Sequence, residues 1–390
     1  MSLRTVSMAA IAGCCVIAAP LAYSQTNGIF ADFTTSMGNF TCQLSYSNSP
    51  MAVANFMGLA TGGRAWLDLP SGEMRHTPFY DGLTFHRVIA GFMNQGGSPN
   101  GHGTDDPGYA FVDQFSPLLN FNDPWVLAMA NSGPNSNGSQ FFVTVAPFAS
   151  GNNIYVILGG VISGTNVVSA INRVATDPNN KPLTNVVIQH IAIRRVGLAA
   201  QAFDINAQGL PIVTNLVLKL DEGSGKASLT YSNRLFCDNR LYSSTDLSSW
   251  ASNMLGVEIA APFGNTVQVT SDAPQQFFRI AQIQYPSSTF APKDLLGRTL
   301  TLIFTGVGTN TVVFDKAGGG TYNFPPVSPG TVASYSWTQD VYRGALWPIK
   351  YSGLNDMTLL LNFTNATGGS FSGTVYNASP FPVSGAFSLK

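Results

Sequence analysis

Charged residues are scarce in this chain. Lys, Arg, Asp and Glu make up 10% of its 390 residues, whereas a typical globular protein has roughly a quarter. The formal net charge is -1. The chain therefore lacks the excess of basic residues that is typical of proteins that bind nucleic acid or anionic membranes. Hydrophobic residues make up 45%, which is enough for real cores and excludes wholesale disorder. Ser, Thr, Asn and Gly supply the polar surface.

Cysteine and histidine are equally rare, with four of each in the chain. Cys14 and Cys15 lie in the N-terminal apolar stretch, while Cys42 and Cys237 are far apart. This spacing excludes a disulfide framework and the CxxC ligand pairs of zinc sites. We expect Cys42 and Cys237 to be buried thiols. Because the histidines do not cluster, we expect no metal site.

Long hydrophobic runs are also missing, and the N-terminal one is short. Residues 1–24 are predicted to be a secretory signal peptide, with the basic start MSLR, an apolar stretch over about 6–19, and LAYS before a cut ahead of Gln25. One alternative is an uncleaved membrane anchor, for which the stretch is short. Another is lipidation of Cys14, whose IAGC resembles a lipoprotein box but lies early in the stretch. After cleavage we expect no membrane span, and an exported protein in the periplasm, in the extracellular space or on the cell surface.

The mature chain divides into three predicted regions: 28–197, 198–286 and 292–390. The first mixes short strands with two helices, one opened by Ser49-Pro50 and ended by TGG, the other over about 166–175. After residue 197 the helical signal disappears. The second region is predicted to be a β-rich module, and the third an antiparallel β module with Gly-rich turns.

Two stretches of the first region carry candidate chemistry. Residues 85–97 read FHRVIAGFMNQGG, and residues 129–148 read MANSGPNSNGSQFFVTVAPF. In an extended strand Phe85, Arg87 and Ile89 would share one face, and His86 would face away as a structural histidine. An arginine among apolar residues is costly unless it has partners or a function. The residues alone therefore predict an apolar pocket with an arginine and amides at its rim.

Together the two stretches resemble the cyclophilin family of peptidyl-prolyl cis-trans isomerases. They match the family's F-H-R-x-I-x-G-F-M-x-Q-G-G and M-A-N-x-G-P-N-x-N-G-S-Q-F-F, while GHGT at 101–104 and ANFMGLATG are similar to its glycine-rich loop and first helix. The resemblance covers about 29–196 and says nothing of 198–390. It implies a mainly β fold, a cyclophilin-like eight-stranded antiparallel β-barrel with two helices. Two β-sandwich or small-barrel modules would follow it.

The resemblance also implies an activity and its residues. The chain would isomerise X-Pro bonds of exported proteins without a cofactor, and its partners would be proline-containing segments of client proteins. Arg87 would be the catalytic donor to the prolyl nitrogen, and Gln95 would bind the substrate backbone beside it. The implied substrate-binding residues are Phe92, Met93, Gly103, Ala130, Asn131, Gln140, Phe142, Phe148 and Tyr155.

The sequence departs from the family pattern at two of these positions. Phe148 begins FASG where many members have Trp-Leu-Asp-Gly, and Tyr155 aligns with a frequent histidine after a short insertion at 152–153. Both residues keep an aromatic pocket. The loss of the tryptophan is expected to weaken binding of the cyclic peptide cyclosporin while catalysis survives.

Several alternatives stay open from the sequence. Arg87 could be a structural arginine tied to a carboxylate, and the apolar residues could simply be core. The domain could bind proline peptides without catalysis, as a chaperone module. The C-terminal modules could make the protein a surface adhesin or carbohydrate binder. Their tyrosines and tryptophans could stack on sugars, although aromatic residues more often fill a β core.

Overall fold

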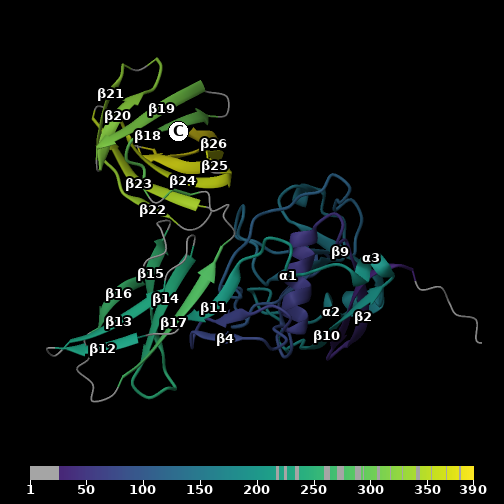
Figure 1. Cartoon of the computed structure of the whole chain (residues 1–390). Coiled ribbons are helices and arrows are strands. Elements are labelled where there is room, and N and C mark those ends of the chain that lie inside the picture. The colour runs from purple at the N-terminus through teal and green to yellow at the C-terminus, as the bar shows by residue number, and fades with distance from the viewer. Residues whose placement is uncertain are drawn as a thin grey trace, which may run out of the picture.

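The computed structural model describes residues 26–216 without a break and most of 219–390 (Figure 1). The undescribed positions after 216 are 217–218, 224–225, 233–236, 259–263, 270–275, 286–290, 293, 305–307, 317, 327, 340–342, 353, 366 and 377–378. The predicted signal peptide therefore lies outside the described residues. No helix of the described part is long and apolar enough to cross a membrane.

Eight strands of the first region form one antiparallel sheet in the order β10-β1-β2-β9-β7-β8-β6-β5. Their bounds are β1 Gly28–Thr35, β2 Gly38–Leu44, β5 Phe85–Ile89, β6 Met93–Gly96, β7 Val126–Met129, β8 Phe141–Thr144, β9 Ile157–Ser163 and β10 Ile188–Val196. The ends of the sheet meet, because Gly82 N donates to Ile188 O at 2.8 Å and Phe85 N to Val186 O at 2.9 Å. These bonds close the sheet into a barrel, which confirms the predicted fold. β3 (Trp66–Asp68) and β4 (Glu73–Arg75) form a separate hairpin.

The helices agree in part with the sequence. α1 (Pro50–Thr61) begins and ends as predicted, with Gly62 in the left-handed region at φ 68°. Ser49 precedes the helix, but its hydroxyl makes no capping bond and donates to the carbonyl of Ile157 at 2.7 Å. α2 (Thr165–Ile171) is shorter than predicted, and a one-turn α3 (Leu198–Gln201) follows where no helix was expected. A 3-10 turn, η1, covers Ala149–Gly151.

The middle region consists of two antiparallel sheets, β11-β17-β14-β15 and β12-β13-β16. Their strands are β11 Ile212–Leu216, β12 Lys219–Gly223, β13 Lys226–Ser232, β14 Cys237–Ser244, β15 Ala251–Glu258, β16 Gly264–Val269 and β17 Phe277–Gln284. Buried Val213, Tyr242 and Ile283 belong to the same hydrophobic cluster as the core of the first barrel. This module therefore shares a hydrophobic cluster with the first region and packs on its β3–β4 hairpin (Figure 1).

Two arginines of the first region fasten the segment that leads into this module. The Arg64 guanidinium donates to the carbonyl of Pro211 at 2.6 Å, and Arg64 is only 7% exposed. Arg195 donates to the carbonyl of Phe203 at 2.6 Å. Burying a cation is costly unless it is hydrogen-bonded, and these bonds to backbone carbonyls offset that cost for Arg64 and hold the connection in place.

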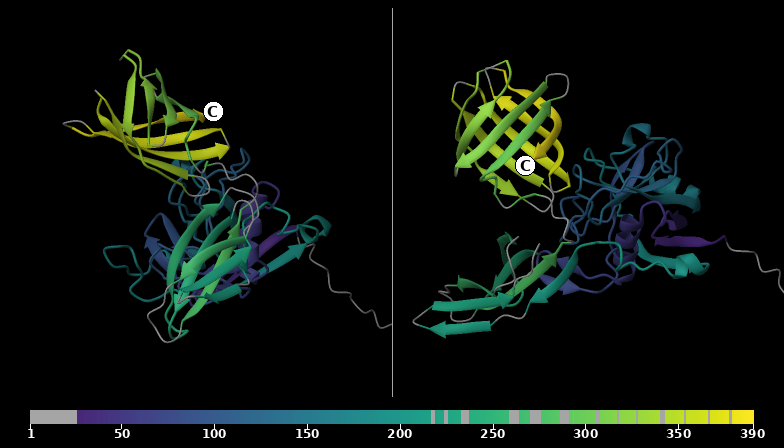
Figure 2. Two further views of the ribbon diagram at one scale, coloured as in Figure 1. Left: turned by 60° about the vertical axis from the view of Figure 1, so that its left-hand side comes forward. Right: turned by 45° about the horizontal axis from the view of Figure 1, so that its top comes forward.

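The C-terminal region forms a second closed barrel (Figure 2). The strand order is β21-β20-β19-β18-β26-β25-β24-β23-β22, and a further pairing of β21 with β23 closes eight strands and leaves β22 outside the ring. The bounds are β18 Arg298–Phe304, β19 Gly308–Lys316, β20 Gly319–Asn323, β21 Gly330–Ser334, β22 Trp337–Gln339, β23 Arg343–Tyr351, β24 Asp356–Asn365, β25 Gly368–Tyr376 and β26 Phe381–Leu389. Of the two forms expected, sandwich or small barrel, this region is a barrel. Its described interior is filled by side chains such as Phe314, Phe363 and Leu300.

Candidate active site

The candidate site lies on the hairpin of β5 and β6, where an irregular pairing places Arg87 on the surface. The register of the two strands shifts between Phe85 and Arg87. As a result Phe85 is buried in the barrel core at 1% exposure, while Arg87 is exposed. The predicted shared face of Phe85 and Arg87 is therefore wrong, because the bulge breaks the alternation of a regular strand.

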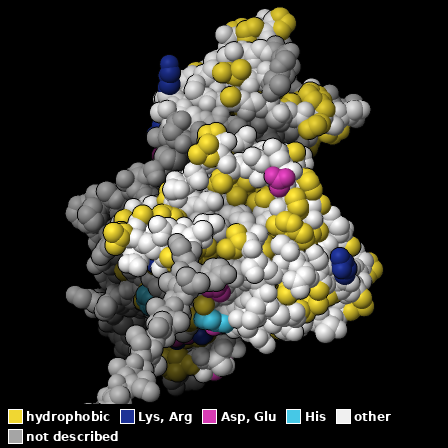
Figure 3. Space-filling view, turned by 90° about the vertical axis from the view of Figure 1, so that its right-hand side faces the viewer, with side chains coloured by type: hydrophobic (Ala, Val, Ile, Leu, Met, Phe, Trp, Pro, Cys, Tyr) yellow, Lys and Arg dark blue, Asp and Glu magenta, His cyan; other side chains and the backbone are white. Residues whose placement is uncertain are grey.

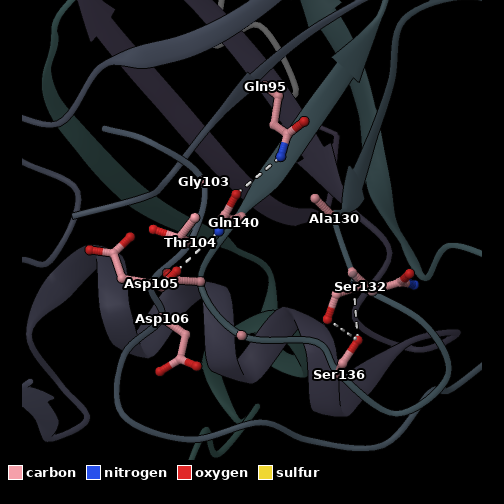
Figure 4. A pocket seen from close by; sticks show the side chains of 12 residues that line it. Gln95, Gly103, Thr104, Asp105, Asp106, Ala130, Ser132, Ser136 and Gln140 are labelled. Carbon is pink, nitrogen blue, oxygen red and sulfur yellow. Dashed lines mark hydrogen bonds between the residues drawn. The ribbon is translucent and has the colours of Figure 1, made fainter. Parts of the chain in front are cut away.

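A chain of hydrogen bonds starts at Arg87. Its Nη1 donates to Gln95 Oε1 at 3.3 Å, and Gln95 lies directly opposite Arg87 in the hairpin. Gln95 Nε2 donates to Gln140 Oε1 at 3.0 Å, and Gln140 Nε2 donates to the backbone carbonyl of Asp105 at 3.0 Å (Figure 4). The guanidinium is thus held from one side by an uncharged acceptor. The alternative in which Arg87 is tied to a carboxylate has no support, because none of the described ion pairs involves Arg87.

Beside this chain lies an apolar cluster that is separate from the main core. Its buried members are Met93, Phe121, Val126, Ala128, Phe142 and Ile157, and half-buried Ile89, Phe92, Leu119, Ala130, Phe148 and Tyr155 pack against them. The rings of Phe92 and Phe148 meet edge-on with centroids 4.8 Å apart, as do those of Phe142 and Tyr155 at 5.3 Å. The cluster therefore offers an aromatic surface of the kind that accepts a small ring.

Phe121 belongs to this cluster although neither motif contains it. It is fully buried and stacks on Phe142 with 10° between the ring planes. Phe121 lies in a loop without regular structure, outside both motifs. The only available signal was an aromatic residue within the polar stretch NFNDPW.

A polar cavity of about 360 Å³ adjoins the apolar cluster (Figure 4). It is lined by Gln95, Gly103, Thr104, Asp105, Asp106, Ala130, Asn131, Ser132, Ser136, Gly138, Ser139 and Gln140. No cationic side chain is among them, so the two aspartates give the cavity an acidic character. Burial raises the pKa of Asp106, against the opposing effects of the Gly108 amide and Arg240.

The loop 131–138 forms one wall of this cavity. Asn131 Nδ2 donates to the carbonyl of Ile154 at 2.8 Å, which ties the wall to the segment that carries Tyr155. Asn135 is held by Asp113 on one side, and its Nδ2 donates to the carbonyl of Phe363 in the C-terminal barrel at 3.0 Å. The second barrel therefore contacts the outer side of the wall.

His86 faces inward behind the same cavity. It is 6% exposed, and burial lowers its pKa to about 4 despite the opposing charge of Asp105. A Cβ at Gly103, whose φ is +76°, would lie 3.2 Å from His86 Nε2. Gly103 thus permits close packing on the histidine. The buried position of His86 agrees with the structural role expected for it.

Every predicted site residue lies in this region. Phe92, Met93, Ala130, Phe142, Phe148 and Tyr155 belong to the apolar cluster, and Gln95, Gly103, Ala130, Asn131 and Gln140 line the polar cavity. Arg87 joins the two through Gln95. Asp105 and Asp106 were not predicted, because only the fold brings their loop to the motif 129–148, whereas the serines of the cavity lie within that motif. No group of three potential metal ligands occurs among the described residues.

On the face shown in Figure 3, charged side chains are sparse and hydrophobic ones lie in small groups. This agrees with the scarcity of charge in the composition.

Residues 30–193 match the family described as cyclophilin type peptidyl-prolyl cis-trans isomerase/CLD. Peptidyl-prolyl cis-trans isomerase B of Streptomyces anulatus is 45% identical over 168 residues, which cover 42% of this chain and 96% of that protein. Peptidyl-prolyl cis-trans isomerase A of Mycobacterium tuberculosis is 46% identical over 176 residues, covering 44% and 97%. A solved cyclophilin type isomerase of Cryptosporidium parvum is 30% identical, covers 43% of this chain and 98% of its own, and has a TM-score of 0.38.

The matches to the two bacterial relatives cover 96% and 97% of those proteins, and the family match ends at residue 193, before the two appended regions. Both motifs lie within the residues that the family model matches, and the first barrel occupies the same part of the chain. The chain belongs to the cyclophilin family of peptidyl-prolyl cis-trans isomerases.

Proposed function

We propose that this enzyme isomerises X-Pro bonds through Arg87, which stabilises the twisted amide while the proline ring sits in the apolar cluster. The observation that carries the proposal is the position of Arg87, which is exposed at the edge of this cluster and held by Gln95 at 3.3 Å. The cluster supplies the apolar pocket, and Phe92, Met93 and Phe142 contact the ring. Gln95, Asn131 and Gln140 bind the substrate backbone at the rim.

The physical basis is differential binding. An amide resists rotation with a barrier of about 18–20 kcal/mol because of its partial double bond. When the bond twists, the prolyl nitrogen regains its lone pair and becomes a better hydrogen-bond acceptor. A guanidinium that donates to this nitrogen binds the twisted form more strongly than the planar one, which lowers the barrier. A rate gain of about 10⁵ requires roughly 7 kcal/mol of such stabilisation.

Gln95 supports this role of Arg87. A neutral acceptor orients the guanidinium without neutralising it, whereas a carboxylate in the same place would offset its charge. The remaining donors of the guanidinium stay available for the substrate.

The test is exchange of a short Ala-Pro-Phe-type peptide by the full chain and by its Arg87→Ala variant. We expect kcat/KM to fall roughly 100-fold or more in the variant, with peptide binding largely kept, because one transition-state donor is lost. Equal rates in the folded wild type and variant would contradict the mechanism. They would favour a proline-peptide binder without Arg-assisted catalysis.

We further propose that the enzyme acts on exported proteins. The signal-like residues 1–24 and the weakly charged surface support export to the periplasm, cell surface or medium. The appended modules would then place the enzyme near its clients. Fractionation of cells that express the full chain tests this, and a cytoplasmic, uncleaved product would contradict it.

Binding of polysaccharide by the C-terminal barrel gains little support from its aromatic side chains. Tyr322 and Tyr351 are buried, and half-buried Tyr335 and Trp337 pack against the barrel core. The side chains of Tyr342 and Trp347 lie outside the described part. These four rings fill or cover the barrel, as aromatic residues usually do in a β core, whereas Tyr376 and Phe381 of the same barrel are exposed.

A further inference from the structure

Arg240 of β14 reaches from the middle module to a loop of the candidate site. Its Nη2 donates to the backbone carbonyl of Gly108 at 3.2 Å. The pairing of β14 with β15 shifts register between Asn239 and Arg240, and such bulges re-aim side chains. Asn239 is fully buried, and Arg240 turns from the module toward the catalytic domain.

The loop that receives this bond lines the polar cavity. Gly108 N donates to Asp106 Oδ1 at 2.7 Å, and Leu67 N donates to the carbonyl of Pro107 at 2.9 Å. Gly108 has φ +94°, and a Cβ there would lie 2.5 Å from Leu67 Cβ. The loop 105–108 is therefore held closely against β3 and has little freedom once Arg240 is in place. The charge of Arg240 also lowers the pKa of Asp106, which burial raises.

From this loop the hydrogen bonds continue to the catalytic arginine. The carbonyl of Asp105 accepts from Gln140, Gln140 accepts from Gln95, and Gln95 accepts from Arg87. Each glutamine accepts with its oxygen and donates with its nitrogen, so the orientation of one amide sets that of the next. A shift of the Asp105 carbonyl would reorient Gln140 first and then the groups beyond it.

We propose that Arg240 is a positioning residue of the isomerase site, which acts from outside the family's domain through loop 105–108, Gln140 and Gln95 on Arg87. The family match ends at residue 193, so the appended module contributes to catalysis as well as to location. The inference rests on the catalytic role proposed for Arg87.

The test compares four full-length proteins: wild type, Arg240→Met, Arg279→Met and Arg87→Ala. Arg279 is the matched control, because its Nη1 also reaches from the module to a carbonyl of the first region, that of Ser71 at 2.9 Å. Ser71 does not line the cavity. Peptide exchange at saturating substrate gives kcat. NMR of the Gln95 and Gln140 side-chain amides reports directly on the hydrogen bonds that link Asp105 to Arg87.

We expect Arg240→Met to lower kcat by about threefold to tenfold and to shift both amide resonances. Arg279→Met should keep the wild-type rate and resonances. Wild-type kcat or unmoved amides in Arg240→Met would overturn the proposal, and so would equal effects of both variants. If Arg87→Ala keeps full activity, the proposed mechanism fails. The amide resonances still decide whether Arg240 positions Gln140 and Gln95.

Discussion

The rings of Phe121 and Phe142 lie 5.9 Å apart between centroids and nearly parallel, one from an irregular loop and the other from β8. This stacking supports the floor of the pocket proposed for the proline ring. Phe148 closes the same group, with its centroid 5.6 Å from that of Phe121. The pocket therefore depends on a residue that none of the motifs contains.

Replacing Phe121 should damage both stability and substrate binding. Phe121→Ala removes a fully buried ring, and we expect a loss of about 3 to 5 kcal/mol in unfolding free energy together with a higher KM. Phe115→Ala is the matched control, because Phe115 lies in the preceding loop and is 42% exposed. Its effect on stability should stay within about 0.5 kcal/mol. Chemical denaturation measures the unfolding free energy of both variants, and peptide exchange measures KM. Similar losses of stability in the two variants would show that the ring of Phe121 does not support the fold more than an exposed ring does.

The acidic cavity should select among residues that flank the proline. Ala130, Gln95 and Gln140 border both the cavity and the predicted peptide path, so a side chain next to the proline can enter it. We expect peptides with Lys at one flanking position to be turned over about threefold to fivefold faster than peptides with Glu. Asp106→Asn should reduce this preference, and added salt should weaken it.

The same preference should depend on pH in one direction. Burial raises the pKa of Asp106, so its carboxyl group loses its proton at a higher pH than a free aspartate does. The preference for Lys should therefore increase with pH through that titration. A ratio of rates that is equal at all pH values, or that favours Glu, would contradict the assignment.

His86 should make the fold sensitive to mild acid. Its pKa is lowered to about 4 by burial, whereas an exposed histidine titrates near 6.5. Between these values the unfolded chain binds more protons, so the unfolding free energy falls as pH decreases through this window. In His86→Gln this part of the pH dependence should disappear. Denaturation at pH 7.5 and pH 4.5 checks it, and an unchanged difference between the two pH values would refute it.

The contact between the first barrel and the middle module can be tested at Gly72. A Cβ at Gly72, where φ is +68°, would overlap the ring of buried Tyr242. Gly82 is a matched control, since its φ is +83° but no atom lies within 4 Å of an added Cβ. Both alanine variants carry the backbone strain of a left-handed residue, and only Gly72→Ala adds the clash.

We expect Gly72→Ala to lose about 1 to 3 kcal/mol more unfolding free energy than Gly82→Ala. Chemical denaturation of the two full-length variants measures this difference. Equal losses would mean that the module does not sit tightly on Gly72. They would also weaken the view that the barrel and the module share one core.

Much of the candidate site was readable from the sequence because its residues occur in two continuous motifs. Arg87, Gln95 and the aromatic residues of 85–97 and 129–148 were selected through the resemblance of these two motifs to the cyclophilin family. The β-barrel and the start of α1 at Pro50 followed from the same resemblance and from turn and cap residues, and the structure confirms them. The roles of the site residues, and export, stay predictions.

Other features depend on contacts between distant segments, which no local pattern records. The bulge that separates Phe85 from Arg87 arises from pairing with β6, and the loop hydroxyl of Ser49 bonds to β9 instead of capping its own helix. The predicted boundary at residue 197 marks where the helical signal and the family resemblance end, and the hydrophobic core runs across it to Tyr242 and Ile283.

The sequence by itself therefore determined the family, the barrel and the set of residues that could carry the chemistry, because covalent order and side-chain type suffice for those. Only the tertiary structure decided that Phe121 stacks on Phe142, that Asp105 and Asp106 line the polar cavity, and that Arg240 bonds to Gly108 in the same loop. Burial and hydrogen bonding act through space, and these residues become neighbours only when the chain is folded.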